Sequence, residues 1–311
     1  MSDSDKKWSV YRLKVEADQA GNRLDQFLPN VSGDLSRSLV RKVIDMGGVH
    51  VNGQRTRTCS QCVSSGDRVE LYLDHLPLNA YRISSQDVIY QDNYLIVLNK
   101  PAMVETQPTH ARYKGTLYEA LQYHLKDPFR PRQKPALGMI QRLDRSTSGL
   151  IVFSTHPRAH KKMTQMFVDG SVEKTYLALV AGRPEPASGE ITSLLARSRR
   201  ENRVHSVAVG GKMAITRYHT DTVLNKHSLL CVRILTGRSH QIRAHMSELG
   251  CPLLGDRRYD GPSTIDSLEL SRAMLHAHKL KFMHPVTGHP LVFCVPMPED
   301  MMNAVNFLGR R

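Results

Sequence analysis

The sequence has few cysteines, few aromatic residues and no long apolar run, and these absences exclude several classes of protein. Its five cysteines are odd in number and scattered over 311 residues, which excludes the disulfide framework of small secreted domains. The longest apolar stretches are strand-sized, as at residues 95–98, and fall short of the ~18 residues of a membrane span. Residues 1–10 are polar and contain lysine, unlike a secretory signal. We therefore expect a cytoplasmic protein with reduced thiols and no membrane partner.

Metal-ligand patterns are also scarce. Cys59 and Cys62 form a C-x-x-C pair, but a structural zinc needs about four ligands, and His50 is the only further candidate nearby. His240 and His245 are five residues apart, so they do not share a helix face as the i, i+4 pair of a zinc protease does. The sequence predicts no metal site.

Acidic residues are outnumbered by basic ones. Lys and Arg number 43 against 29 Asp and Glu, for a net charge of +14. Residues 1–80 are nearly balanced, with 11 basic and 10 acidic side chains, whereas residues 81–311 hold 32 and 19. An excess of this kind suits a polyphosphate partner, because each neutralised phosphate releases counterions. The alternative is a basic surface without a specific ligand.

The first part of the chain has the pattern of a small module of helices and a hairpin. Apolar residues at helical spacing follow Ser36, a candidate N-cap, and the helix is expected to end at Gly47. Asn52-Gly53 between two alternating segments predicts a hairpin turn. Residues 77–87 contain proline, asparagine and serine with little periodicity, and we interpret them as a linker.

The most informative stretch is QRLDRSTSGL at residues 141–150. Asp144 lies between Arg142 and Arg145, and turn-forming residues lead from it into an apolar run typical of a buried strand. A carboxylate beside guanidinium groups stays ionised at neutral pH and can act as a nucleophile or a base. Taken alone, the same pattern also fits an ion-pair cluster on the surface.

Two later segments bring further polar groups. Residues 171–180 have the pattern of a strand in which Lys174 and Tyr176 point to the same face. Residues 235–246 turn from strand into helix and contain Arg238 and Arg243, and such a helix start can bind an anion, including a carboxylate of the same chain.

Two other basic segments have the pattern of loops. One is the arginine cluster at residues 197–203, and the other is the proline-containing segment at residues 127–135. Either could contact phosphate or simply be solvated.

The stretch RLDRSTSGL resembles the RLDxxTSGL signature of the RluA-type pseudouridine synthases. The family's lysine and tyrosine strand has a counterpart in EKTYLA at residues 173–178, and its TGRxHQIRxH stretch has one at residues 236–245, in the same order. Residues 21–73, with SRS before a helix, GGVHVNG after it and GDRVEL at the end, resemble the alpha-L RNA-binding module. The resemblance thus covers nearly the whole chain.

The resemblance implies isomerisation of uridine to pseudouridine in RNA without a metal or organic cofactor. Asp144 matches the catalytic aspartate, which attacks C1′ or removes the C2′ proton. Tyr176 matches the tyrosine that stacks on the target base, and Arg243 the arginine that pairs with the aspartate. Arg142 matches an arginine that enters the RNA helix where the flipped base was.

Further RNA contacts follow from the same resemblance. They are expected from the basic side chains of the pocket and of the first module, namely Lys174, Arg238, Arg37, Arg41 and Lys42. Two departures from the family pattern, Gln141 in place of a common histidine and the segment KPAMVE at residues 100–105, bear on the choice of substrate.

We therefore predict an α+β protein. An N-terminal α/β RNA-binding module at residues 1–76 and a linker at residues 77–87 precede a catalytic domain at residues 88–311, which has a mixed, largely antiparallel sheet with packed helices. The expected partner is RNA, ribosomal RNA of the large subunit in preference to transfer RNA, and no obligate protein partner is implied. The alternatives are a non-catalytic RNA-binding factor of ribosome assembly and a hydrolase that releases free uracil. A hydrolase usually needs two carboxylates, whereas only one is found in this motif.

Overall fold

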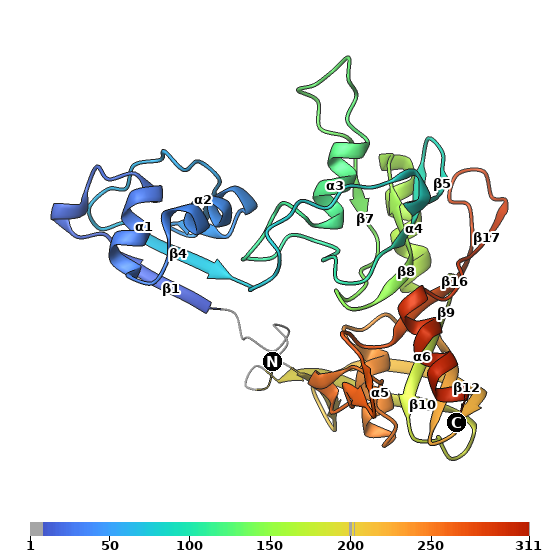
Figure 1. Cartoon of the computed structure of the whole chain (residues 1–311). Helices are drawn as coiled ribbons and strands as arrows, with labels where there is room; N and C mark the ends of the chain where they lie inside the picture. Colours follow the sequence, from blue (N-terminus) through green and yellow to red (C-terminus); the bar gives the residue numbers. More distant parts are fainter. Residues whose placement is uncertain (1–8, 199–200, 202, 311) are drawn as a thin grey trace. The chain divides into compact units, whose positions relative to one another are not determined.

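The computed structural model describes residues 9–198, 201 and 203–310, and the chain forms two compact units (Figure 1). The first unit comprises Met1–Ile83 and Glu105–Gln133, and the second Ser84–Val104 and Lys134–Arg311. Residues 105–133, which the sequence analysis assigned to the catalytic domain, thus group with the N-terminal unit. The division into functional domains at residues 76 and 88 stays a prediction.

The first unit is a four-stranded antiparallel sheet with helices. The strands lie in the order β1-β4-β2-β3. Their bounds are β1 (Ser9–Lys14), β2 (Val49–Val51), β3 (Gln54–Thr56) and β4 (Arg68–Leu73). The helices are the short η2 (Ala17–Gln19), α1 (Leu24–Ser32), α2 (Arg37–Met46) and α3 (Leu117–His124).

Local chemistry accounts for these elements. The Ser36 hydroxyl accepts a hydrogen bond from the Leu39 amide and caps α2, and Gly47 ends the helix with a φ of 90°. The apolar stripe of α2 packs against that of α1 in a core that includes Val40 and Phe27. Asn52 and Gly53 have φ values of 50° and 79°, as a two-residue hairpin turn requires. The predicted cap, helix end and turn are confirmed.

The second unit is built on a large mixed sheet. Within the described residues it has 11 strands, in the order β11-β10-β12-β13-β9-β16-β8-β6-β5, with β17 beside β16 and β7 beside β8. The first strands are β5 (Val88–Gln91), β6 (Leu95–Lys100), β7 (Gly138–Met139), β8 (Ser148–Ser154) and β9 (Glu173–Ala181). The others are β10 (Ser188–Ser198), β11 (Arg203–Val207), β12 (Lys212–Leu224), β13 (His227–Ile234), β16 (Leu275–Met283) and β17 (Pro290–Cys294). Of these pairings only β8 with β16 is parallel, so the predicted α+β class with a largely antiparallel sheet is confirmed.

Short elements complete this unit. They are the α-helices α4 (Pro157–Val168), α5 (Gln241–Glu248) and α6 (Glu299–Gly309), the short 3₁₀ helices η3 (Ser85–Asp87) and η4 (Arg257–Tyr259), and the small strand pair β14 (Thr264–Ile265) and β15 (Leu268–Glu269). No helix in the described part of the chain is long and apolar enough to cross a membrane.

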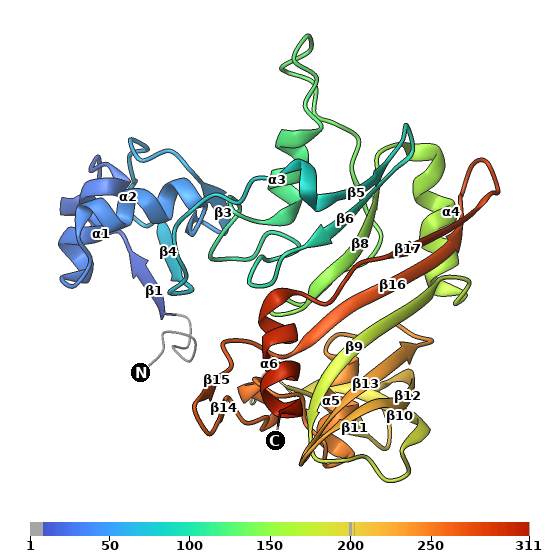
Figure 2. The same ribbon diagram turned by 45° about the vertical axis from the view of Figure 1, so that its right-hand side comes forward.

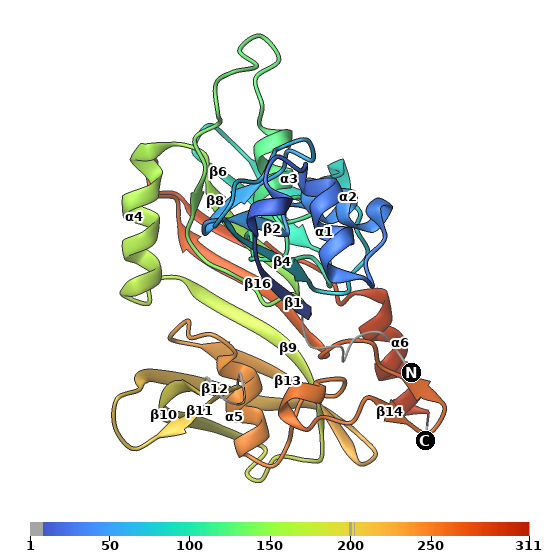
Figure 3. The same ribbon diagram turned by 90° about the vertical axis from the view of Figure 1, so that its left-hand side faces the viewer.

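The central strands β9 and β16 run side by side and carry different helices on their two faces (Figures 2 and 3). Leu179 of β9 packs in one core cluster with Met301 of α6. On the other face, Lys174 and Tyr176 of β9 line a cavity together with Phe167 of α4. The cavity therefore lies on the side of the sheet that faces away from α6.

One predicted loop is instead a hairpin. Arg197 lies in β10 and pairs with Val204 of β11, and Arg203 pairs with Ser198. Arg199 and Arg200 lie outside the described residues. The loop prediction was wrong for the strand residues because the ladder between β10 and β11 provides backbone hydrogen bonds that side-chain polarity does not reveal.

The parallel contact between β8 and β16 depends on Gly149. This residue pairs with Ala277, its φ is 107°, and a Cβ atom added to it would lie 2.3 Å from the Ala277 carbonyl oxygen. Only glycine allows this approach of two backbones.

We predict that Gly149→Ala destabilises the second unit. The added methyl group must displace backbone, and the positive φ strains any other residue, so the free energy of unfolding should fall by about 2–4 kcal/mol. Thermal denaturation of the full chain measures the effect. Gly237→Ala is the matched control, because nothing lies within 4 Å of its added Cβ. Equal melting temperatures for the two variants would contradict the explanation.

Candidate active site

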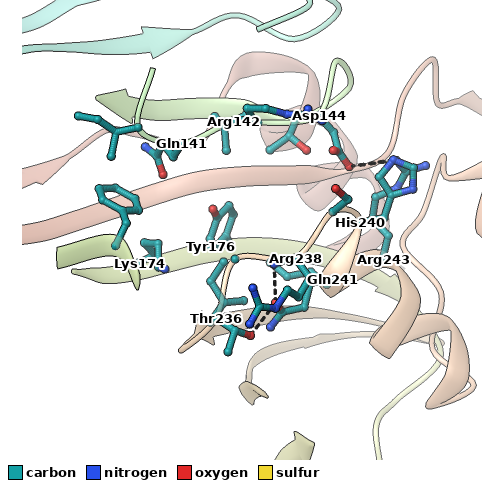
Figure 4. Close-up of a pocket in the computed structure, with 18 of the residues that line it drawn as sticks. Gln141, Arg142, Asp144, Lys174, Tyr176, Thr236, Arg238, His240, Gln241 and Arg243 are labelled. Atoms are coloured by element: carbon teal, nitrogen blue, oxygen red, sulfur yellow. Dashed lines mark hydrogen bonds and ion pairs between the residues drawn. The ribbon is translucent and has the colours of Figure 1, made fainter. Parts of the chain in front are cut away.

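A cavity of about 520 Å³ lies in the second unit, between the loop before β8, the strand β9 and the segment that leads into α5 (Figure 4). Its lining includes most of the residues that the sequence analysis singled out in this part of the chain. They are Arg142, Asp144, Lys174, Tyr176, Arg238 and Arg243. The structure thus brings three separate sequence motifs to one site.

Asp144 lies four residues before β8, and one of its carboxylate oxygens is held by Arg243. Arg243 Nη1 donates to Asp144 Oδ2 over 3.0 Å, and His240 Nε2 is 3.8 Å from the same oxygen. No described residue donates to Oδ1. The side chain keeps 23% of its surface exposed and lines the cavity.

Arg243 is itself fixed by a second carboxylate. Its Nε and Nη2 donate to the two oxygens of Asp256 over 2.6 and 2.7 Å. The guanidinium also lies over the ring of Tyr259, 4.9 Å from the centroid. Because this bidentate pair leaves Nη1 for Asp144, the direction of the bond to Asp144 is set by the fold.

The charge state of Asp144 follows from opposing effects. Burial raises the pKa of its carboxyl group, whereas His240, Arg243 and, to a lesser extent, Arg142 lower it. The lowering prevails, and the pKa lies below its ordinary value. Asp144 is therefore an anion at neutral pH.

His240 is neutral, and its tautomer can be assigned. The Val204 amide donates to the Tyr259 hydroxyl over 2.8 Å, and that hydroxyl lies 2.9 Å from His240 Nδ1. Nε2 faces the Asp144 carboxylate, which can only accept, so the tautomer with the proton on Nε2 and with Nδ1 accepting from the Tyr259 hydroxyl fits both contacts. Burial lowers the pKa of His240 to about 4, which keeps the ring uncharged at pH 7.

Lys174 and Tyr176 lie on β9 and both face the cavity, as the period-two rule predicted (Figure 4). Burial and the charge of Asp144 raise the pKa of Tyr176, so its phenol stays protonated. Lys174 is only 4% exposed and has no acidic partner among the described residues; its Nζ lies 5.4 Å from the ring centroid of Phe167. Burial and nearby Arg238 lower the pKa of Lys174 to about 8.

The rim of the cavity carries three more polar groups. Arg142 and Arg238 are exposed, and Arg238 is oriented by a bond of 2.8 Å from its Nε to the Met213 carbonyl. The side-chain nitrogen of Gln141 is buried without a hydrogen-bond partner among the described residues. Gln141, one of the departures from the family pattern, therefore has a donor available at the cavity.

Buried cations fasten the loop that carries Asp144. Lys100 is fully buried, and its Nζ donates to the Pro101 and Arg145 carbonyls over 2.8 and 3.4 Å. Arg272 Nη1 donates to the Ser146 carbonyl over 3.0 Å. Sequence reasoning missed Lys100, Arg272, Asp256 and the role of His240. The available signals were a lysine at the end of an apolar strand, and a histidine inside the TGRSHQIR stretch.

The basic residues expected on the first module lie on α2 of the first unit. Asp25, which is wholly buried, accepts from Arg23 and Arg37 over 3.0 and 3.1 Å, and Arg41 lies 4.0 Å away. Lys42 is exposed. The buried carboxylate thus gathers arginines whose side chains remain about half exposed.

Metal-ligating groups are not clustered in the part of the chain that the structure describes. No three His, Cys, Asp or Glu side chains there could hold one ion.

Comparison with known proteins identifies both parts of the chain. Residues 94–248 match the family model described as RNA pseudouridylate synthase, and residues 22–69 match the S4 domain. An uncharacterized RNA pseudouridine synthase of Aquifex aeolicus is 33% identical over 316 residues, which cover 96% of this chain and 97% of the relative.

Other relatives have more specific names. A ribosomal large subunit pseudouridine synthase D of Vibrio parahaemolyticus is 33% identical over 300 residues, 93% of this chain and 91% of its own. The structure of human RNA pseudouridylate synthase domain containing 4 covers 73% of this chain and 94% of its own with a TM-score of 0.60; at 22% identity it shows the fold alone. Together with the family models, the sequence relatives show that this chain belongs to the RluA-type RNA pseudouridine synthases and carries an S4 RNA-binding domain.

Proposed function

We propose that this enzyme isomerises specific uridines of large-subunit ribosomal RNA to pseudouridine, with Asp144 as its single catalytic carboxylate. The observation that supports this role best is the bond from buried Arg243 to Asp144 Oδ2, which keeps the carboxylate ionised inside the cavity and leaves Oδ1 free. A base inside an RNA stack cannot reach such a group, so the target nucleotide must be flipped into the cavity.

Oδ1 is then the reacting oxygen of Asp144. In one route it attacks C1′ while the C1′–N1 bond breaks, and in the other it removes the C2′ proton as the base departs. In the first route C5 of the turned uracil displaces the Asp144 oxygen from C1′, and in the second C5 bonds to C1′ while the proton on Asp144 returns to C2′. In either route C5 then loses its proton and N1 gains one. No water is consumed, so a lone carboxylate is sufficient where a glycoside hydrolase would need two.

The other cavity residues are assigned to the substrate. Tyr176 is proposed to pack on the target base and to assist loss of the C5 proton, and Lys174 to contact an oxygen of the flipped nucleotide. Arg238 and Arg142 at the rim are proposed to contact phosphates, with Arg142 entering the RNA helix at the place of the flipped base. In the S4 domain, Arg37, Arg41 and Lys42 are proposed to bind the RNA backbone.

Ribosomal RNA is favoured as the substrate because several relatives are named as synthases of the large ribosomal subunit. Transfer RNA is the second candidate, and the reaction would take place in the cytoplasm. Mapping pseudouridines in total RNA from cells with and without this protein distinguishes the two. Loss of a site in large-subunit RNA is the expected result, and loss only in transfer RNA would contradict it.

Asp144→Asn should abolish pseudouridine formation. The amide keeps the shape of the side chain but has neither the charge nor the basicity, so the rate should fall at least about a thousandfold, as for other groups that act on the reacting atoms. Asp169→Asn is the matched control, because Asp169 lies exposed at the end of α4. A fully active Asp144→Asn enzyme would refute the assignment. Free uracil among the wild-type products would indicate a hydrolase instead.

The affinity for RNA should depend on pH through Lys174. Its ammonium group is charged below a pKa of about 8 and neutral above it, so KM for RNA should rise as the pH passes this value. Steady-state kinetics between pH 6.5 and 9.5, for the wild type and Lys174→Met, measure the effect. The variant should have a high KM at low pH and should lack the rise. An identical pH dependence in both proteins would exclude Lys174 from substrate binding.

A further inference from the structure

A short, exposed loop after α3 has no part in the reaction proposed for the cavity. It comprises residues 126–133, called here the finger, and in all three ribbon views it stands away from α3 (Figures 1, 2 and 3). Every residue of the finger is exposed. Phe129 is 92% exposed, more than any other large hydrophobic side chain that the structure describes.

The finger is held by its own turns. The Phe129 amide donates to the Asp127 carboxylate over 2.8 Å. The Arg130 amide donates to the Asp127 carbonyl over 3.2 Å, and the Gln133 amide to the Arg130 carbonyl over 2.9 Å. Pro128 and Pro131 restrict the backbone further. The exposed ring is therefore presented by an ordered tip, which lowers the entropic cost of binding a ligand there.

The three positive charges of the finger are available to a ligand of negative charge. Lys126, Arg130 and Arg132 form no ion pair with any described residue, and the carboxylate of Asp127 is engaged within its own turn. A single exposed phenylalanine is common on protein surfaces. An exposed ring between unpaired cations is a combination typical of single-stranded nucleic-acid sites, where bases stack on aromatic side chains and cations follow the backbone.

We propose that the finger is a second RNA contact, separate from the cavity and from the arginine cluster around Asp25. Phe129 stacks on an unpaired base of the RNA, and Lys126, Arg130 and Arg132 neutralise the adjoining phosphates. The partner is single-stranded RNA because stacking on a ring needs an accessible base face, which a continuous duplex does not offer. The inference rests on RNA being the partner of this family, and it is independent of which uridine is modified.

Binding of the full chain to a fluorescent single-stranded oligouridine tests the stacking contact. Phe129→Ala should raise Kd at least about fivefold, because losing the stacking of one base on an aromatic side chain weakens binding by about this factor or more. Phe129→Trp should retain the affinity. Val209→Ala is the matched control, because Val209 is 86% exposed and lies outside the finger. Ultraviolet cross-linking of the wild type should modify the peptide that contains Phe129.

The salt dependence of oligouridine binding tests whether the basic side chains of the finger neutralise phosphates. The double variant Arg130→Gln and Arg132→Gln should lower the slope of log K against log salt by about 1.4, from a contribution of about 0.7 per phosphate of a single strand. Arg12→Gln, at an exposed arginine paired with Glu70, should leave the slope unchanged.

Two results would overturn the proposal. One is an unchanged Kd for Phe129→Ala, and the other is a loss of affinity confined to a blunt RNA duplex. The substituted side chains are all exposed, and circular dichroism melting verifies that the variants remain folded. Pseudouridine formation is measured in parallel with the wild type. An active wild type with an unchanged Kd for Phe129→Ala refutes the finger alone, whereas an inactive wild type refutes the proposed reaction and leaves the binding test intact.

Discussion

The site depends on the ion pairs that the guanidinium of Arg243 forms with two carboxylates, those of Asp144 and Asp256. Isolated charges in a protein interior are costly, and a buried pair is favourable only when its geometry is good and its hydrogen bonds are satisfied. Here Asp256 takes two donors of Arg243 and Asp144 takes a third. Asp256 thus fixes the cation, and the cation fixes one oxygen of Asp144. The Asp144 carboxylate can then remain charged although it is partly buried.

Other contacts within the second unit fix the position of Asp144 and its loop. Gly149 allows β8 to approach β16, and Lys100 and Arg272 tie down the backbone just after Asp144. These buried cations bind carbonyl oxygens, so they fasten the loop without competing for the carboxylate. Neutral His240, locked by Tyr259, faces Asp144 with an N–H group. The site therefore combines the anion of Asp144 with groups that hold it and its loop in place.

Much of this could be predicted from local sequence patterns. The cap at Ser36, the turn at Asn52-Gly53 and the shared face of Lys174 and Tyr176 follow from rules that act over a few residues. The pairing of Asp144 with Arg243 joins residues 99 positions apart. The residue pattern indicated only that a carboxylate of the chain could bind at the helix start with Arg243, and the family resemblance named Asp144. Asp256, Lys100 and Arg272 act through contacts between distant segments, which no local pattern encodes. The hairpin of β10 and β11 was missed for the same reason.

The ionisation of Asp144 can be measured directly. In protein labelled with ¹³C at the aspartate carboxyl group, the signal absent from Asp144→Asn identifies the residue, and a titration follows its chemical shift. We predict that the signal keeps its carboxylate position on acidification past pH ~3.9, the ordinary pKa of an aspartate, and that in Arg243→Met the midpoint moves above this value. A wild-type midpoint at or above pH ~3.9 would contradict the view that Arg243 keeps Asp144 charged.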